Sequence, residues 1–273
     1  MHVIIRVMLF IVLFAKVEAQ GAPFDDCADH LPFGAPTLTG KANTTPLCHA
    51  GYALLHDDDF KVPRWVAYKL TGKHSLGCLK RTNNFHVEDD LAEGHRATPA
   101  DYRNSKPKYD RGHQAPAQDF AWNADLLSDT FSMANMAPQL PGLNQQGWLR
   151  LEETVRAWAL ERGTVIVYVG PVVLKTGPVI GPNKVRVPVA FWKVAIDPKS
   201  REAIAFRMPQ QKIAKGDLTK WKISVADIEQ LTGLTLPLPD GVDREADPPL
   251  WPANLSTWNA KKRAACSSKA KSS

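Results

Sequence analysis

The segment Tyr109-Asp110-Arg111-Gly112-His113-Gln114-Ala115-Pro116 brings a carboxylate, a guanidinium and an imidazole together within four consecutive residues. Imidazole titrates near neutral pH and can take a proton from water. Arginine stays charged and offers a planar set of donors that suits phosphate oxygens. Gly112 permits a backbone geometry that is closed to bulkier residues. The segment therefore predicts acid–base chemistry on an anionic group, centred on His113, although a histidine in such a stretch can also be purely structural.

A helix is predicted over residues 144–161, opening with Leu143-Asn144-Gln145-Gln146-Gly147-Trp148. Gly163 follows the last apolar position and is typical of a helix end. The apolar side chains recur at intervals of three and four residues, which indicates one buried face. They are Trp148, Leu151, Val155, Trp158 and Ala159.

A second set of positions on this helix is polar. Steps of four residues connect Asn144, Trp148, Glu152 and Arg156. One helix face would therefore carry an amide oxygen, a carboxylate and an arginine. A hard cation such as Mg²⁺ accepts few protein oxygens and keeps several waters, so these donors would be enough to hold it. The alternative is a solvated face with an ion pair between Glu152 and Arg156.

Together with Asn135, these two segments resemble the DNA/RNA non-specific endonucleases, which have the ββα-metal fold. The resemblance covers roughly residues 62–209. It rests on Asp110-Arg111-Gly112-His113, on Asn135, and on the helix with Leu143-Asn144-Gln145, Glu152 and Arg156. It implies an α+β fold with a central antiparallel sheet flanked by helices. It also implies a Mg²⁺-dependent enzyme that hydrolyses DNA and RNA with little sequence specificity.

The resemblance gives each site residue a role. His113 would be the general base that deprotonates the attacking water. Asn144 would be the single direct protein ligand of a hydrated Mg²⁺, and Glu152 would hold the waters of that ion. The remaining roles are neutralisation of the phosphorane by Arg156 and Arg81, a further phosphate contact from Arg111, orientation of the His113 loop by Asn135, and an orienting part for Asp110.

The same resemblance implies a product and a substrate range. The metal would stabilise the departing 3′-oxygen, so that cleavage leaves a 5′-phosphate. Water is the nucleophile and the 2′-hydroxyl is not needed, so DNA and RNA are both expected partners. Phosphate contacts carry no base information. Mn²⁺ would satisfy oxygen ligands nearly as well as Mg²⁺.

Two rival functions fit the same residues. One is a catalytically inactive nucleic-acid-binding protein on the same scaffold, against which the intact set of His113, Asn144 and Glu152 argues. The other is a metallophosphoesterase that acts on small phosphoesters or nucleotides. A formal net charge of +6 makes a polyanionic partner plausible, but many exported proteins are basic for other reasons. The oligomeric state is left open.

The N-terminus has the pattern of a signal peptide over residues 1–19. Arg6 precedes the apolar run 7–15, and Val17-Glu18-Ala19 offers small residues for cleavage before Gln20. The run is far shorter than the roughly 20 residues that a membrane-spanning helix needs. The chain is therefore expected to be secreted or periplasmic and free of the membrane after cleavage, with an uncleaved anchor as the alternative.

Four cysteines follow the cleavage site, and an even number in an exported chain favours two disulfides. A local loop closure by Cys27 and Cys48 is preferred. It leaves Cys78 and Cys266 to tie the C-terminus to the body, although the spacing does not decide the pairing.

The rest of the chain is predicted to form a single nuclease domain over residues 61–260, since 44% apolar residues can fill a large core. Residues 20–60 are expected to be an irregular lead-in, residues 71–120 a long irregular stretch, and residues 261–273 a basic tail, either frayed or in contact with phosphate. Strands are predicted at 65–70, 164–170, 189–196 and 203–208, and a short helix between a Ser224 N-cap and Gly233.

Two acidic clusters and the tryptophans remain. Asp57-Asp58-Asp59 reads as a solvated acidic turn in preference to a Ca²⁺ site, because the EF-hand spacing is absent. A second metal site is a weaker alternative at His86, Glu88, Asp89, Asp90 and His95. The tryptophans are expected in the core, although an exposed one could stack on a base; they are Trp122, Trp148, Trp158 and Trp192.

Overall fold

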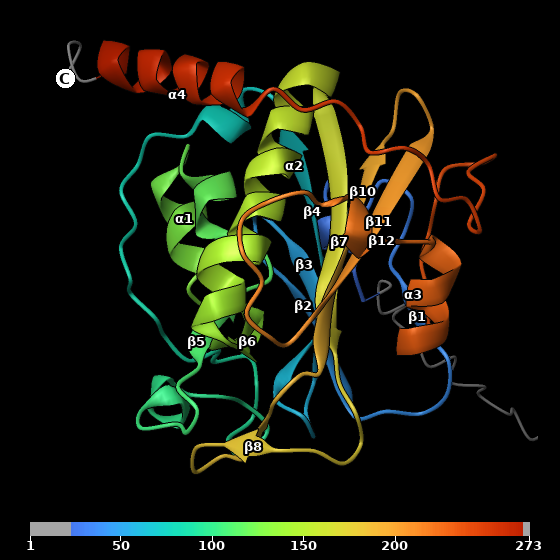
Figure 1. Cartoon of the computed structure of the whole chain (residues 1–273). Coiled ribbons are helices and arrows are strands. Elements are labelled where there is room, and N and C mark those ends of the chain that lie inside the picture. The colour runs from blue at the N-terminus through green and yellow to red at the C-terminus, as the bar shows by residue number, and fades with distance from the viewer. Residues whose placement is uncertain (1–22, 270–273) are drawn as a thin grey trace, which may run out of the picture.

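The computed structural model of the chain describes residues 23–269, which form an α+β fold around one large sheet (Figure 1). The sheet has seven strands in the order β12-β11-β10-β7-β4-β3-β2, and every neighbouring pair is antiparallel. The strands are β2 (Thr44–Cys48), β3 (Ala53–Asp57), β4 (Val62–Thr71), β7 (Thr164–Val172), β10 (Ala190–Asp197), β11 (Glu202–Pro209) and β12 (Lys222–Ile223).

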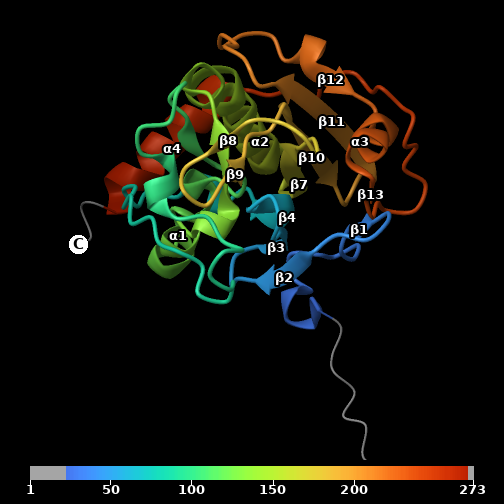
Figure 2. The same cartoon turned by 90° about the horizontal axis from the view of Figure 1, so that it is seen from below.

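Helices and short strand pairs cover both faces of this sheet (Figures 1 and 2). One face carries α2 (Leu149–Arg162), α1 (Ala124–Asp129) and the strand pair β5 (Asp110–His113) and β6 (Met136–Gln139). The other face carries α3 (Val225–Thr232) and the pair β1 (Thr37–Leu38) and β13 (Leu234–Thr235). The C-terminal helix α4 (Leu255–Lys269) lies against α2 at one end, and β8 (Val179–Ile180) pairs with β9 (Val185–Arg186) at the other.

The central strand β7 is apolar at almost every position because both of its faces are buried. Val165, Val167 and Val169 point into the core beneath α2, whereas Ile166 and Tyr168 point into the core beneath α3. Both sets are buried, so the strand is a continuous apolar run in place of an alternating one. β-Branched residues fit such a pleated surface well.

Most of the predicted elements are confirmed. The strands predicted at 65–70, 164–170, 189–196 and 203–208 lie within, or within one residue of, β4, β7, β10 and β11. Helix α3 begins after Ser224, whose hydroxyl accepts a hydrogen bond from the Asp227 amide at 3.0 Å, and ends at Gly233 in a left-handed conformation. Both disulfides are as preferred from the sequence, Cys27–Cys48 and Cys78–Cys266.

The irregular lead-in predicted for residues 20–60 is wrong. Strands β2 and β3 belong to the main sheet, and β3 pairs with β4. Strand β2 forms the edge of the sheet, where a proline such as Pro46 is tolerated because one side of the strand needs no partner. Proline and threonine in this stretch therefore indicate an edge strand and not a loop.

The other end of the chain also differs from the expectation. Residues 261–269 of the predicted basic tail are part of helix α4 and do not form a frayed end. The disulfide to Cys78 and the burial of Trp258 hold this helix on the body.

The helix predicted over 144–161 is in two parts. Residues Leu143–Trp148 form a π-helical turn, and α2 follows directly. A Cβ atom on Gly147 would lie 2.4 Å from Cγ2 of Ile213, and the Gly147 amide donates to the Ile213 carbonyl at 2.9 Å. The loop that contains Ile213 thus approaches the helix closely, and the wider turn is local to that contact.

Candidate active site

A strand–strand–helix unit carries the site residues expected from the sequence. Strands β5 and β6 pair antiparallel, with His113 opposite Met136, and the π-helical turn and α2 follow them in the chain. A cleft of about 750 Å³ lies over this unit. Six of the seven predicted site residues line the cleft: Arg81, Arg111, His113, Asn144, Glu152 and Arg156. The seventh, Asn135, is completely buried behind it.

The imidazole of His113 is neutral and its Nε2 atom is available. The side chain is only 7% exposed, and burial, followed by the charge of Arg81, lowers the pKa of His113 to about 3. The ring forms a hydrogen bond with the backbone of Arg111, and this bond raises the pKa of His113. The ring is therefore the donor and the Arg111 carbonyl the acceptor, because a bond that the imidazole donates favours its protonated form. Nε2 has no hydrogen-bond partner in the described chain. His113 lines the cleft, and no hydrogen bond within the described chain occupies the lone pair of its neutral imidazole.

The backbone around His113 is held from behind by Asn135. The side-chain oxygen of Asn135 accepts from the Ala115 amide at 2.8 Å, and its amide group donates to the carbonyls of Ala115 and Thr130 at 3.0 and 2.9 Å. The Gln114 amide donates to the Asn135 carbonyl at 3.0 Å. These bonds fix the strand end two residues beyond the imidazole.

Gly112 is required for a different reason from the one expected. It lies in extended β5 and does not adopt a positive φ angle. A Cβ atom at this position would lie 2.5 Å from Oε1 of Gln139 and 3.0 Å from the Ala137 carbonyl oxygen. The close approach of β6, and not an unusual backbone conformation, excludes a side chain.

Asn144 and Asp110 lie together at the mouth of the strand pair. Nδ2 of Asn144 donates to Oδ2 of Asp110 at 2.9 Å, and Nε2 of Gln145 donates to the same oxygen at 2.8 Å. Asp110 thereby fixes which way the Asn144 amide turns, with its nitrogen towards β5.

A buried chain of charges underlies the cleft. Nε of Arg156 lies 2.5 Å from Oδ1 of Asp119, and its Nη2 atom lies 3.3 Å from Oε2 of Glu152. The other oxygen of Asp119 accepts from the Tyr68 hydroxyl at 2.9 Å. Burial raises the pKa of Glu152, and the charge of Arg156 partly offsets this rise. Burial alone would lower the pKa of Arg156, but the charges of Asp119 and Glu152 outweigh it and raise that pKa.

This arrangement corrects two expectations about the helix face. Trp148 does not line the cleft with Asn144, Glu152 and Arg156, because it is completely buried and packs on Phe191. The solvated alternative for the Glu152–Arg156 pair is also wrong, since their side chains are only 12% and 3% exposed. The pair belongs to the floor of the cleft.

Two further arginines approach His113 over aromatic rings. Cζ of Arg111 lies 3.9 Å from the ring centroid of Phe85, and Cζ of Arg81 lies 4.8 Å from that of Phe131. Both rings also pack edge-on against His113. The guanidinium groups are therefore held beside the imidazole by stacking, and neither forms an ion pair with a carboxylate of the described residues.

Three participants were missed by the sequence reasoning. Asp119 and Tyr68 come from distant segments and have no spacing that links them to Arg156. Lys193 is completely buried on β10, and its Nζ atom lies 5.0 Å from the Trp148 ring centroid without a hydrogen-bond partner in the described residues. A lone lysine inside the apolar run 189–196 was the one available signal.

The oxygen donors of the cleft fit a hydrated hard cation. Asn144, Glu152 and Asp110 offer amide and carboxylate oxygens, which Mg²⁺ and Mn²⁺ accept. Within residues 23–269 no group of three or more histidines, cysteines and carboxylates forms a dedicated metal cage. An ion here would keep most of its waters.

The acidic clusters have structural partners. Asp57 pairs with Arg64 at 2.5 Å and accepts two backbone bonds in the turn after β3, while Glu88 accepts from Ser132 at 2.6 Å. The acidic turn is confirmed, but it is not solvated, because Asp57 and Asp58 are buried. The second metal site is wrong, since no three or more histidines, cysteines and carboxylates of the described residues gather where they could hold an ion. Three of the four tryptophans are completely buried as expected, and Trp122 stacks on His74 with ring centroids 3.7 Å apart.

The comparisons with known proteins agree with this geometry. The sequence profile described as DNA/RNA non-specific endonuclease matches residues 30–245. Mitochondrial Endonuclease G of Bos taurus is 34% identical over 200 residues, which cover 68% of this chain and 66% of the relative, a little under two thirds. A nuclease of Serratia marcescens is 32% identical over 230 residues, which cover 80% of this chain and 83% of the relative.

A solved structure shares the fold. It is a crystal structure of the EndoG/EndoGI complex, described as showing the mechanism of EndoG inhibition. The match has a TM-score of 0.69 and 27% sequence identity, and it covers 80% of this chain and 92% of the solved one. With the ββα unit, the cleft and the profile match taken together, the chain belongs to the family of DNA/RNA non-specific endonucleases.

Proposed function

We propose that this chain is an endonuclease that hydrolyses phosphodiester bonds of DNA and RNA with little sequence specificity. The observation that carries the proposal is the unpartnered Nε2 atom of a neutral His113 in a cleft lined by arginines and oxygen donors. A neutral imidazole is the form that can accept a proton. Because the whole unit is similar to nucleases, we take the substrate of the water that His113 activates to be a nucleic acid.

His113 takes the proton of the attacking water at Nε2. The bond from the ring to the Arg111 carbonyl keeps the other nitrogen protonated and fixes the tautomer. Asn135, through its bonds to Ala115, keeps the strand end in place during the reaction. It is a positioning residue, because it does not reach the cleft.

The arginines bind the phosphate. Arg81 and Arg111 lie beside His113, and Arg156 lies on the floor of the cleft. Their charges stabilise the additional negative charge that develops when water adds to phosphorus. Because the charges are fixed before substrate binds, little reorganisation is needed.

Asn144 would hold a divalent cation directly through its amide oxygen, and Glu152 would bind it through water. Asp110 supports this assignment, since it accepts from Nδ2 of Asn144 and thereby orients the amide. When bound, Mg²⁺ would supply positive charge at the phosphate and at the departing 3′-oxygen, which favours a 5′-phosphate product. Mn²⁺ suits the same donors.

Secretion or a periplasmic location is part of the proposal. Two disulfides support it, because disulfides persist mainly in oxidising compartments. The expected signal peptide at residues 1–19 lies outside the described residues. Among the described residues no helix is long and apolar enough to cross a membrane. The Endonuclease G relatives are named mitochondrial, so the location needs its own test, by N-terminal sequencing of the mature protein.

The experiment is digestion of plasmid DNA and of RNA side by side, with Mg²⁺ and with EDTA. Both substrates should be degraded to 5′-phosphate ends, and EDTA and His113→Ala should each abolish cleavage. A His113→Ala variant as fast as the parent would overturn the assignment of the base. Binding without cleavage would instead favour an inactive nucleic-acid-binding protein. Preference for a chromogenic phosphomonoester would favour a phosphoesterase for small substrates.

A further inference from the structure

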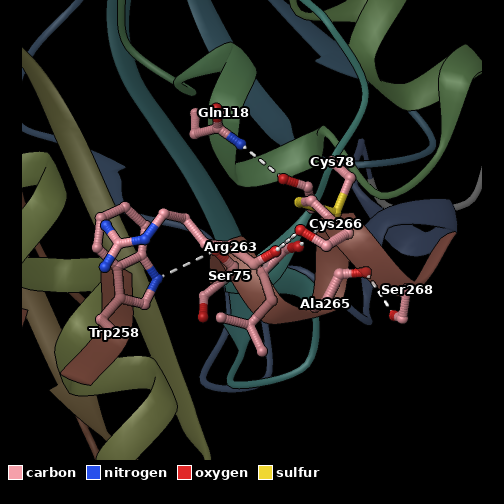
Figure 3. The surroundings of a disulfide bond; sticks show 11 residues. Ser75, Cys78, Gln118, Trp258, Arg263, Ala265, Cys266 and Ser268 are labelled. Carbon is pink, nitrogen blue, oxygen red and sulfur yellow. Dashed lines mark hydrogen bonds between the residues drawn. A yellow bond between two sulfur atoms is a disulfide. The ribbon is translucent and has the colours of Figure 1, made fainter. Parts of the chain in front are cut away.

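Helix α4 is attached to the body at two points along one face. Trp258, Lys262 and Cys266 follow one another in steps of four residues and so share that face. Nε1 of Trp258 donates to the Ser75 carbonyl at 3.2 Å, and Cys266 is bonded to Cys78 (Figure 3). Lys262 lies between these two attachments, so the helix holds its side chain in a defined place.

The same loop connects α4 with the site. Ser75 and Cys78 lie in one short segment, and Nε2 of Gln118 donates to the Gly77 carbonyl at 3.1 Å (Figure 3). Gln118 is the residue before Asp119, the partner of Arg156. Helix α4 is therefore tied to the segment that supports the floor of the cleft.

Helix α4 also forms part of the cleft itself. Trp258, Asn259 and Lys262 line it together with His113, Asn144 and the site arginines. This helix starts at Leu255, beyond the family match, which ends at residue 245. The family assignment therefore gives no role to this wall.

Lys262 forms no ion pair with a described residue, although the charges of Asp119 and Glu153 act on it from farther away. Its Nζ atom lies 5.4 Å from the Trp258 ring centroid, and Cζ of Arg156 lies 5.9 Å from the same centroid. Burial, followed by the charge of Arg156, lowers the pKa of Lys262. The two cations thus lie over one indole ring. Arg156 forms ion pairs with two carboxylates, whereas Lys262 forms no ion pair among the described residues.

The composition of α4 points to the same kind of ligand. Its residues Leu255–Lys269 include four lysines and arginines and no aspartate or glutamate. An anion brought against Lys262 would relieve its repulsion from Arg156 and would meet no carboxylate on this helix. A chain of phosphates fits the requirement, because successive charges can meet both walls of the cleft.

We propose that α4 is an additional wall of the nucleic-acid cleft and that Lys262 contacts a backbone phosphate of the bound strand. This inference rests on the proposed function. The charges that act on His113 are those of Arg81 and Arg111 and do not include Lys262, so we assign Lys262 to a phosphate next to the reacting one. Lys262 thus acts in binding the polymer and not in the proton transfer.

The test compares Lys262→Ala with Lys261→Ala, which removes the same charge from an exposed position one residue away on the same helix. Binding of a fluorescent DNA duplex is measured in EDTA on a His113→Ala background, across roughly 50 to 200 mM salt. One phosphate contact fewer should reduce the slope of log affinity against log salt by about 0.9. In the active background, the KM for DNA should rise roughly 3- to 10-fold with kcat nearly unchanged.

Lys261→Ala should leave the salt slope and the KM at parental values. Lys262→Arg, which keeps the positive charge that Lys262→Ala removes, should also have the parental slope and KM. Thermal unfolding of each variant is recorded alongside. Equal effects of Lys261→Ala and Lys262→Ala, no effect of either, or a failure of Lys262→Arg to restore binding would each overturn the role of Lys262. Absence of DNA and RNA cleavage by the parent protein would overturn the proposed function instead, so the two failures are distinguishable.

Discussion

Nε of Arg156 lies 2.5 Å from Oδ1 of Asp119, and both side chains are almost completely buried, with 3% and 1% exposed. Asp119 also accepts from Tyr68, and Arg156 also contacts Glu152. A helix α2 side chain is thus fixed by a strand of the sheet and by the segment that follows His113. The arginine on the cleft floor keeps its place because each of its charged neighbours is itself held.

Asp119→Asn should destabilise the fold by about 3–5 kcal/mol, because it leaves the buried Arg156 charge without its nearest partner. Urea unfolding measures the loss. Glu153→Gln is the matched control. Glu153 lies on α2, the helix of Arg156, and it pairs with the half-exposed Lys215 at 3.3 Å. Its effect should stay within about 0.5 kcal/mol. Equal losses in the two variants would contradict the importance of the buried pair.

The neutral state of His113 makes stability depend on pH. Its folded-state pKa of about 3 lies below the ordinary value of 6.5, so between these values the unfolded chain binds a proton that the folded chain does not. Stability should therefore decrease as the pH falls through this window, with a contribution of about 1.4 kcal/mol per pH unit. Unfolding in urea from about pH 4 to pH 8 measures it.

His113→Asn should remove that contribution and leave the pH dependence of the other histidines in place. The difference between parent and variant isolates the one group. Parallel curves for the two proteins would show that His113 titrates normally in the folded state.

Lys193→Met should raise stability and lower activity. The buried ammonium has no hydrogen-bond partner in the described residues, and burial lowers its pKa, so an apolar side chain of similar length removes a desolvation cost of about 1 kcal/mol or more. Glu152 would lose a balancing charge at the same time. Unfolding in urea and the rate of DNA cleavage are measured on one preparation. Lys69→Met, at an exposed position on β4, should change neither. Lower stability of Lys193→Met would contradict the argument.

The disulfide between Cys78 and Cys266 should matter for binding as well as for stability. Replacing both cysteines by serine should cost about 2–5 kcal/mol, because the bond closes a very long loop in the unfolded chain. Helix α4 would then lose its covalent tether and keep only non-covalent contacts such as that of Trp258, and the KM for DNA should rise. The Cys27–Cys48 pair spans 21 residues and lies away from the cleft, so its double serine variant should lose stability with an unchanged KM. Equal KM values in the two double variants would show that the Cys78–Cys266 bond does not hold α4 in place for DNA binding.

Part of the site could be found from local sequence because its residues lie close together in the chain. Asp110-Arg111-Gly112-His113 occupies one strand, and Asn144, Glu152 and Arg156 lie on successive helical turns. The apolar periodicity of α2 and the β-branched run of β7 likewise predict their own burial. Edge strand β2 and helix α4 were missed because their sequences have too few apolar positions to show a period.

The sequence by itself determined the chemistry of the groups and the secondary structure of the long apolar segments. It did so because residue type and short-range spacing depend only on neighbours in the chain. Only the tertiary structure decided that Asp119, Tyr68 and Lys193 would meet under the cleft and that α4 would close one side of it. Those contacts join residues 37, 51 and 188 positions apart, and such contacts depend on how the sheet, α2 and the Cys78–Cys266 bond pack together.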